Sequence, residues 1–180
     1  DSEGVHQMRV ALRRLRTICG LFRRDIPSPA FRAINGEAKW LMRQLGRARD
    51  WDVFAESTIT RLVKAVPDID LDGLRQAVQQ QRQSSYGTLQ SVLADPRCSR
   101  FLLSLGHLVE RRGWRNEIDS EALAVLSQPM PVLADQILGR LHRKTLKRGA
   151  HFRRLDIQAQ HTLRIDLKKL RYAAEFFLPL

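Results

Sequence analysis

Residues 161–177 read HTLRIDLKKLRYAAEFF, and residues 6–22 read HQMRVALRRLRTICGLF. When the two stretches are aligned, conservative replacements fill several positions and identical residues fill six more. The identical pairs are His6 and His161, Arg9 and Arg164, Leu12 and Leu167, Leu15 and Leu170, Arg16 and Arg171, and Phe22 and Phe177. A match of this length between distant parts of one chain predicts an internal duplication.

Both stretches have the periodicity of an amphipathic helix. At about 100° per residue, the cations of the first copy fall within a sector of about 80°. This cationic row consists of His6, Arg9, Arg13 and Arg16, and its predicted core face of Met8, Ala11, Leu12, Leu15, Ile18, Cys19 and Phe22. In the second copy the corresponding sets are His161, Arg164, Lys168 and Arg171, and Leu163, Leu167, Leu170, Ala173, Ala174 and Phe177.

The charge of the first copy is one-sided. Residues 5–24 contain no acidic side chain. An ordinary solvated helix face mixes both signs of charge, and like charges three or four residues apart repel one another. A bound polyanion would convert that repulsion into attraction.

The composition of the whole chain also favours an anionic partner. The 180 residues are 43% hydrophobic, which is enough for a sizeable core, and the net charge is +12. The cations are 25 arginines and six lysines. The planar guanidinium group matches phosphate oxygens well, although a GC-rich genome would produce the same excess of arginine.

Two cysteines and the lack of an apolar run long enough to span a membrane favour a cytoplasmic protein without disulfides.

Helical periodicity extends over almost the entire chain, so the sequence predicts an all-α fold of long antiparallel helices. The expected helices cover 5–24, 28–47, 50–66, 72–93, 97–113, 130–150 and 157–177. Ser28 before Pro29, Asp50 and Asp72 are expected to begin helices as caps. We expect a first module at 1–113, a second at 130–180 and a seam within 113–131, with the two modules around a basic groove.

Other predicted helices add further basic rows. The second helix carries Arg32, Lys39, Arg43 and Arg47 in one sector, and the helix at 130–150 carries Arg140, Lys144 and Lys147. Rows of guanidinium and ammonium groups suit a flexible chain of phosphates, because every phosphate carries charge and no base has to be read. The affinity for such a ligand should fall steeply with salt.

Four segments together resemble the CHAD family, the conserved histidine α-helical domain. They are HQMRVALRRLRT at 6–17, WLMRQLGRARDWDV at 40–53, LHRKTLKRG at 141–149 and HTLRIDLKKLRYAAEFF at 161–177. The resemblance implies duplicated helices around a basic central cavity that binds inorganic polyphosphate. It also implies an association with polyphosphate granules in the bacterial cytoplasm and with a CYTH-type triphosphatase domain.

Carried over by position, the resemblance implicates two sets of polyphosphate-binding residues. They are His6, Arg9, Arg13, Arg16, Arg43 and Arg47 in the first half, and His161, Arg164, Lys168, Lys169 and Arg171 in the second. Arg140, Lys144 and Lys147, in the basic run from Arg140 to Arg148, match the family in character only, and Lys39 is added from the basic row of the second helix. Members of the family continue beyond the position of Phe177, so we expect a single domain truncated at its C-terminus, or an oligomer in which another chain supplies the missing helices.

Several alternatives remain open. His6 and His161 could be metal ligands, but no carboxylate or thiol stands at ligand spacing, so no metal or other cofactor is expected. Asp50 and Asp52 could assist a metal-dependent phosphohydrolase, or could serve at a helix start. No motif of a known catalytic class is present, so we expect a binding module without catalytic residues. Nucleic acid is the alternative ligand, although the sequence shows no clear stacking platform or groove-reading helix.

Overall fold

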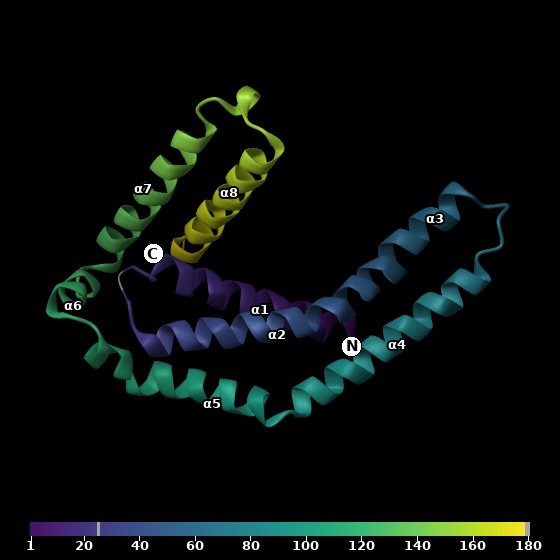
Figure 1. Ribbon diagram of the computed structural model, residues 1–180, viewed down its shortest axis with the longest axis horizontal. Coiled ribbons are helices and arrows are strands. Elements are labelled where there is room, and N and C mark those ends of the chain that lie inside the picture. The colour runs from purple at the N-terminus through teal and green to yellow at the C-terminus, as the bar shows by residue number, and fades with distance from the viewer. Residues whose placement is uncertain (25, 179–180) are drawn as a thin grey trace. The chain divides into compact units, whose positions relative to one another are not determined.

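The computed structural model describes residues 1–24 and 26–178, and every regular element among them is helical. The predicted all-α fold is therefore confirmed (Figure 1). The α-helices are α1 (Ser2–Leu21), α2 (Pro29–Val53), α3 (Thr60–Ala65), α4 (Asp72–Ala94), α5 (Pro96–Arg111), α6 (Ser120–Leu126), α7 (Met130–Gly149) and α8 (Ile157–Phe177). A π-helix, η1 (Phe54–Ile59), and the 3₁₀ helices η2 (Gly113–Glu117) and η3 (Phe152–Arg154) complete the set.

Most of the predicted helices are present, but one predicted break is wrong. The helices expected at 28–47 and 50–66 are joined, because α2 continues to Val53 and leads through η1 directly into α3. The buried residues of α2 explain why. They follow one stripe at helical spacing, made of Ile34, Ala38, Leu41, Leu45, Ala48 and Asp52. Packing of this stripe outweighs the cost of about 1 kcal/mol for Gly46 inside the helix.

The predicted helix caps are only partly confirmed. The Ser28 hydroxyl accepts a hydrogen bond from the amide of Phe31 at 3.2 Å, and α2 begins at Pro29. Asp50 lies inside α2 and therefore cannot cap a helix start. Asp72 is the first residue of α4, and the side chain of Asp70 accepts from its amide at 2.9 Å. Ser28 therefore acts as the predicted cap, whereas Asp50 and Asp72 do not.

The described residues form two compact units. The first comprises residues 1–13 and 33–111, and the second comprises residues 14–32 and 112–180, of which 25, 179 and 180 lie outside the described part. Neither unit is a continuous stretch of chain, because the residues of α1 are shared between the two. The modules 1–113 and 130–180 expected from the duplication stay a prediction.

In the first unit, side chains from α4 and α5 bond to α2. Arg97, in the first turn of α5, donates two hydrogen bonds to the Glu37 carboxylate at 2.7 and 3.0 Å. The Arg97 guanidinium also lies 4.2 Å from the centre of the Trp40 ring. The hydrogen bonds from Arg97 hold the pKa of Glu37 below its usual value.

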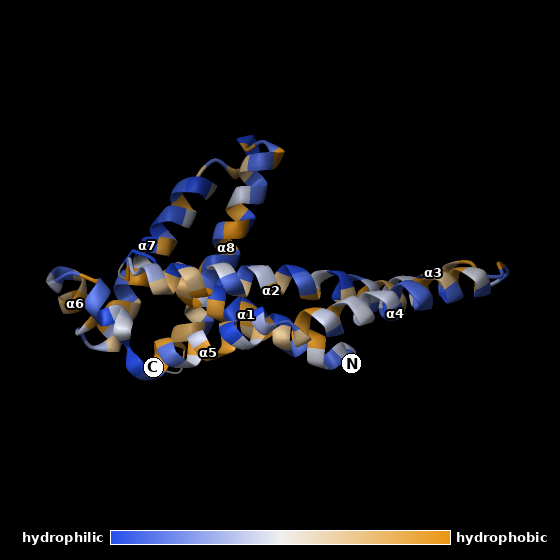
Figure 2. Ribbon diagram, turned by 60° about the horizontal axis from the view of Figure 1, so that its bottom comes forward, coloured by the Kyte–Doolittle hydropathy of each residue, from blue (hydrophilic) through white to orange (hydrophobic). Residues whose placement is uncertain are grey.

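In the second unit, a hydrophobic core joins the C-terminal part of α1 to α7 and α8. Its buried members are Leu21, Phe22, Ile26, Leu133, Ala134, Ile137, Ala173 and Phe177. The rings of Phe22 and Phe177 meet edge to face with centroids 6.4 Å apart. Helices α7 and α8 form an antiparallel hairpin (Figure 1). Figure 2 shows hydrophilic and hydrophobic residues on each of these helices, as expected for elements with one buried face.

Candidate anion-binding surfaces

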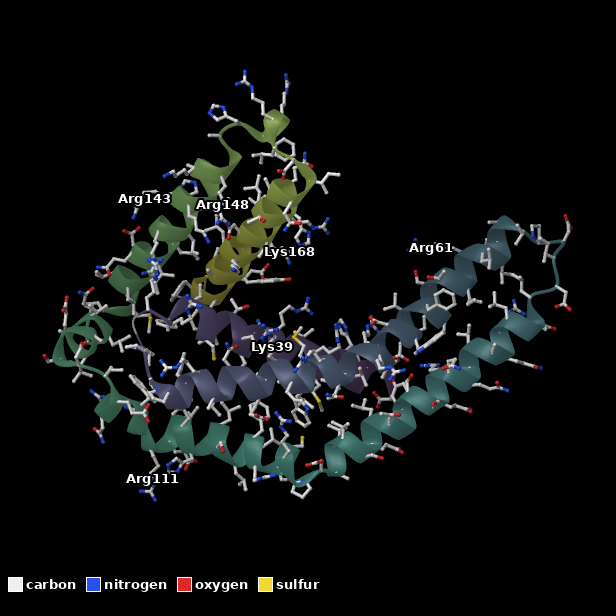
Figure 3. The ribbon with its side chains drawn as sticks, in the orientation of Figure 1. Lys39, Arg61, Arg111, Arg143, Arg148 and Lys168 are labelled. Atoms are coloured by element: carbon white, nitrogen blue, oxygen red, sulfur yellow. The ribbon has the colours of Figure 1, made fainter. Side chains whose placement is uncertain are left out.

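The basic row of α2 lies where the sequence predicts it. Lys39, Arg43 and Arg47 are exposed, on the side of α2 away from its buried stripe. Lys39 is labelled on α2 in Figure 3. Residues spaced by three and four positions share one helix face, so these three cations form a continuous positive strip in the first unit.

The cationic row of α1 is only partly open to solvent. His6, Arg9, Arg13 and Arg16 are all half-buried, whereas Arg14 is exposed. The Arg9 guanidinium donates a hydrogen bond to the carbonyl oxygen of Met42 in α2 at 3.2 Å. Part of this row therefore joins α1 to α2 within the first unit.

The predicted core face of α1 is also partly wrong. Leu12, Cys19 and Phe22 are buried as expected, but Ala11 is exposed. Burial raises the pKa of the Cys19 thiol, which keeps it in the unreactive protonated form. Both cysteines are buried and free, in agreement with the predicted lack of a disulfide.

The basic row of α8 is open to solvent. All five of its predicted site residues are exposed: His161, Arg164, Lys168, Lys169 and Arg171. Figure 3 labels Lys168 on this helix. Arg171 forms an intrahelical ion pair with Glu175, with Nε 3.3 Å from Oε1. An exposed pair of this kind contributes little to stability and leaves the arginine accessible.

The predicted core face of α8 needs a correction. Leu163, Ala173 and Phe177 are buried, but Leu167 and Ala174 are exposed. Asp166, which the prediction omitted from this face, is buried instead, and it lies in the same stripe as Leu163, Leu170 and Ala173. The buried face of α8 is therefore rotated from the expected one and includes a carboxylate.

That carboxylate bonds to cations of α7. The Lys144 ammonium donates to Oδ1 of Asp166 at 3.1 Å, and the Arg148 guanidinium donates to Oδ2. Both cations remain exposed, as does Lys147, while Arg140 is half-buried. The structure thus brings one predicted site residue of α7, Lys144, directly onto α8.

A second buried carboxylate lies at the end of α2. Asp52 accepts hydrogen bonds from the Nε of Arg82 at 2.7 Å and from the hydroxyl of Tyr86 at 2.8 Å. Burial, followed by the hydrogen bond to Asp52, raises the pKa of Tyr86 to about 12. Asp52 lies in the last turn of α2, so its expected position at a helix start is wrong. Both donors to Asp52 come from α4, so Asp52 contacts that helix and does not form a carboxylate pair with Asp50.

Asp52 and Asp166 share a sequence signal that helical spacing could have revealed. Each continues a stripe of apolar residues at spacings of three and four, where a carboxylate is rare unless it is paired. The spacing reveals the buried position. It does not reveal the donors, since Arg82 is 30 residues and Lys144 is 22 residues away along the chain.

Neither predicted histidine has metal-ligand surroundings among the described residues. No cluster of three or more histidine, cysteine, aspartate or glutamate side chains in residues 1–24 and 26–178 could hold an ion.

Trp40, Trp51 and Trp114 are all half-buried, and Arg97 covers one face of Trp40. Within the same described part, no helix combines the length and the apolar character needed to cross a lipid bilayer.

Comparison with known proteins identifies the family. Among curated proteins, none matches the chain. The crystal structure of the CHAD domain from the plant Ricinus communis matches it with a TM-score of 0.73 and 36% sequence identity. That match covers 100% of this chain and 57% of the plant chain, so the sequence spans little more than half of its relative. The profile of the CHAD domain family matches residues 1–180, and the chain therefore belongs to the CHAD domain family.

Proposed function

We propose that this chain binds inorganic polyphosphate through exposed cations on α2, α7 and α8, without catalysing a reaction. The arrangement of the carboxylates supports this proposal most directly. Asp52 and Asp166 are buried against donors from neighbouring helices, and Glu37 is bonded to Arg97. The exposed strips of α2 and α8 therefore retain net positive charge, although Glu175 pairs with Arg171 in α8.

The chemistry of the strips fits a phosphate chain better than a nucleic acid. Guanidinium and ammonium groups at successive helical turns can each contact one phosphate, and flexible polyphosphate can follow such a row. Sequence-tolerant binding of single-stranded nucleic acid usually adds aromatic side chains on which bases stack. The half-buried tryptophans provide no open platform of that kind. Association with a CYTH-type triphosphatase and with polyphosphate granules belongs to the same proposal and follows from the family resemblance.

A titration with polyphosphate over a series of salt concentrations tests the proposal. We expect the logarithm of the affinity to fall linearly with the logarithm of the salt concentration, by about 0.7 for each phosphate contact if polyphosphate behaves like single-stranded nucleic acid. No binding at low salt, or an affinity independent of salt, would overturn it. If RNA displaces polyphosphate readily while the reverse exchange fails, nucleic acid is the ligand instead.

A second measurement separates binding from catalysis. Incubation of polyphosphate with the protein and a divalent metal should release no orthophosphate. Metal-dependent release that disappears in Asp50→Ala would instead show a phosphohydrolase.

A further inference from the structure

The buried carboxylate of the α7–α8 hairpin has two partners and uses one oxygen for each. Asp166 is 4% exposed, with Oδ1 accepting from Lys144 and Oδ2 accepting from Arg148. A carboxylate removed from water requires such partners, since burial disfavours its charge. Both donors come from α7, so the contact fixes two cations of one helix against the other helix.

Lys144 and Arg148 contact the buried carboxylate but remain partly accessible to solvent. The side chains of Lys144 and Arg148 are 47% and 42% exposed, although both contact a buried group. An ammonium group has three N–H donors and a guanidinium group has five, so each keeps donors for another ligand after bonding to Asp166. A long cationic side chain normally loses rotamer freedom when it binds, and the carboxylate has already removed part of that freedom.

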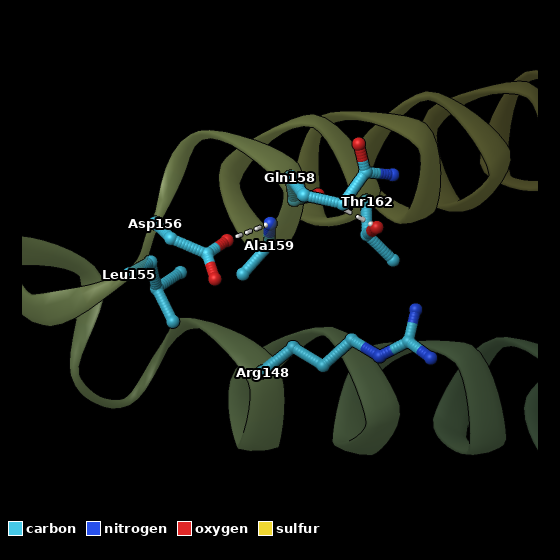
Figure 4. Close-up of a pocket in the computed structure, with 6 residues that line it drawn as sticks. All are labelled: Arg148, Leu155, Asp156, Gln158, Ala159 and Thr162. Atoms are coloured by element: carbon cyan, nitrogen blue, oxygen red, sulfur yellow. Dashed lines mark hydrogen bonds between the residues drawn. The ribbon is translucent and has the colours of Figure 1, made fainter.

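The surroundings of Arg148 leave room beside it. A hollow of about 470 Å³ lies along the start of α8, lined by Arg148, Leu155, Asp156, Gln158, Ala159 and Thr162 (Figure 4). The Asp156 carboxylate within it accepts from the amide of Ala159 at 2.7 Å and so caps α8. Because that carboxylate would repel an anion, the hollow itself is not a favourable place for phosphate.

From this geometry we infer that Asp166 is a positioning residue of the anion-binding surface, which holds Lys144 and Arg148 in place to receive phosphate. The inference rests on the proposed function. Asp166 does not contact the ligand. Its negative charge weakens the attraction of the surface for a polyanion. In return, it orders two cations, which then lose little further rotamer freedom when the ligand binds.

This role predicts the opposite sign from simple electrostatics. Removing a negative charge from a polyanion site should tighten binding if charge alone matters. In Asp166→Asn the side chain keeps its size, but its amide nitrogen faces a donor and can no longer hold both cations. We therefore expect Asp166→Asn to bind polyphosphate on the order of tenfold more weakly at moderate salt, with a shallower salt dependence by about 0.7 for each lost contact.

The matched control is Glu175→Gln, which removes the same charge from the same helix. Glu175 is exposed and its pair with Arg171 is open to solvent, so this variant should bind as tightly as the wild type or more tightly. The salt slope is the decisive readout, because partial unfolding would lower the active fraction without changing the number of phosphate contacts. Weaker binding with a shallower slope in Asp166→Asn alone supports the inference. Binding at least as tight as that of Glu175→Gln, with an unchanged slope, overturns it.

A second variant covers the case in which Asp166→Asn does not fold. Asp166→Glu keeps the charge but moves the carboxylate by one methylene, so electrostatics alone predicts unchanged affinity. Weaker binding with a shallower slope supports positioning, and wild-type behaviour overturns it. If the wild type binds no polyphosphate, the proposed function fails together with this inference. If the wild type binds and the variants do not weaken, only the inference fails.

Discussion

Replacing Asp52 by alanine should destabilise the first unit strongly. Asp52 is completely buried and accepts from Arg82 at 2.7 Å and from Tyr86 at 2.8 Å. Removing one partner of a buried ion pair typically costs about 3–5 kcal/mol, because the remaining group stays buried without its counter-charge. The Arg82 side chain is 27% exposed and Glu56 lies 3.6 Å from it, so partial rescue by water and by Glu56 gives an expected cost of about 3 kcal/mol.

Urea unfolding followed by circular dichroism measures this loss, and amide hydrogen exchange in α2 and α4 locates it. Glu56→Ala is the matched control. Its carboxylate is 51% exposed, so loss of its contact with Arg82 should cost no more than about 1 kcal/mol. An Asp52→Ala protein whose free energy of unfolding lies within about 1 kcal/mol of the wild type would refute the reasoning, since unpaired buried donors carry a larger penalty.

A triple variant tests the physical cause. Asp52→Leu, Arg82→Met and Tyr86→Phe together replace the whole polar cluster by apolar side chains of similar size. Such replacements are often neutral or stabilising, because no donor is left without an acceptor. We therefore expect the triple variant to be more stable than Asp52→Ala. If it is less stable, the loss in the single variant reflects the attraction itself and not the unpaired donors.

Three further predictions concern pH and surface charge. The pKa of Tyr86 is raised from 10.0 to about 12 in the folded state. The contribution of Tyr86 to stability is therefore complete below pH 10 and is lost as the pH rises toward 12. When the melting temperature is measured against pH, Tyr86→Phe should lack that loss. Hydrogen bonds from Arg97 lower the pKa of Glu37, so this pair stabilises the protein above pH 4.5 and the contribution is lost below it. Arg97→Gln should therefore show a smaller acid-induced fall in melting temperature than the wild type. Arg43→Gln and Arg47→Gln should each lower the salt slope of polyphosphate binding by about 0.7 without changing the melting temperature, and an altered melting temperature would show that these exposed residues support the fold.

Helical periodicity predicts elements well where the apolar stripe is uniform, and poorly where a polar residue enters the stripe. The range predicted for the last helix, 157–177, coincides with α8. The helices at 28–47 and 50–66 were expected to be separate because Asp50 resembles a cap. In the structure the stripe continues through Ala48 to Asp52, and the helix continues with it. A carboxylate can occupy such a place only when distant residues donate to it, and periodicity contains no information about those partners.

The two aligned stretches, 6–22 and 161–177, show the same limit of helical periodicity. Leu12 is buried in α1, whereas its counterpart Leu167 is exposed in α8. The cations differ in the same sense, since His6 and Arg9 are half-buried while His161 and Arg164 are exposed. Similar sequences place similar side chains on one helix face, but neighbouring elements decide how far that face is covered. The two helices therefore expose their cations to different extents. In α1, Arg9 already serves the packing against α2, and α8 presents the accessible row, so substitutions in α8 separate ligand binding from folding more cleanly than substitutions in α1.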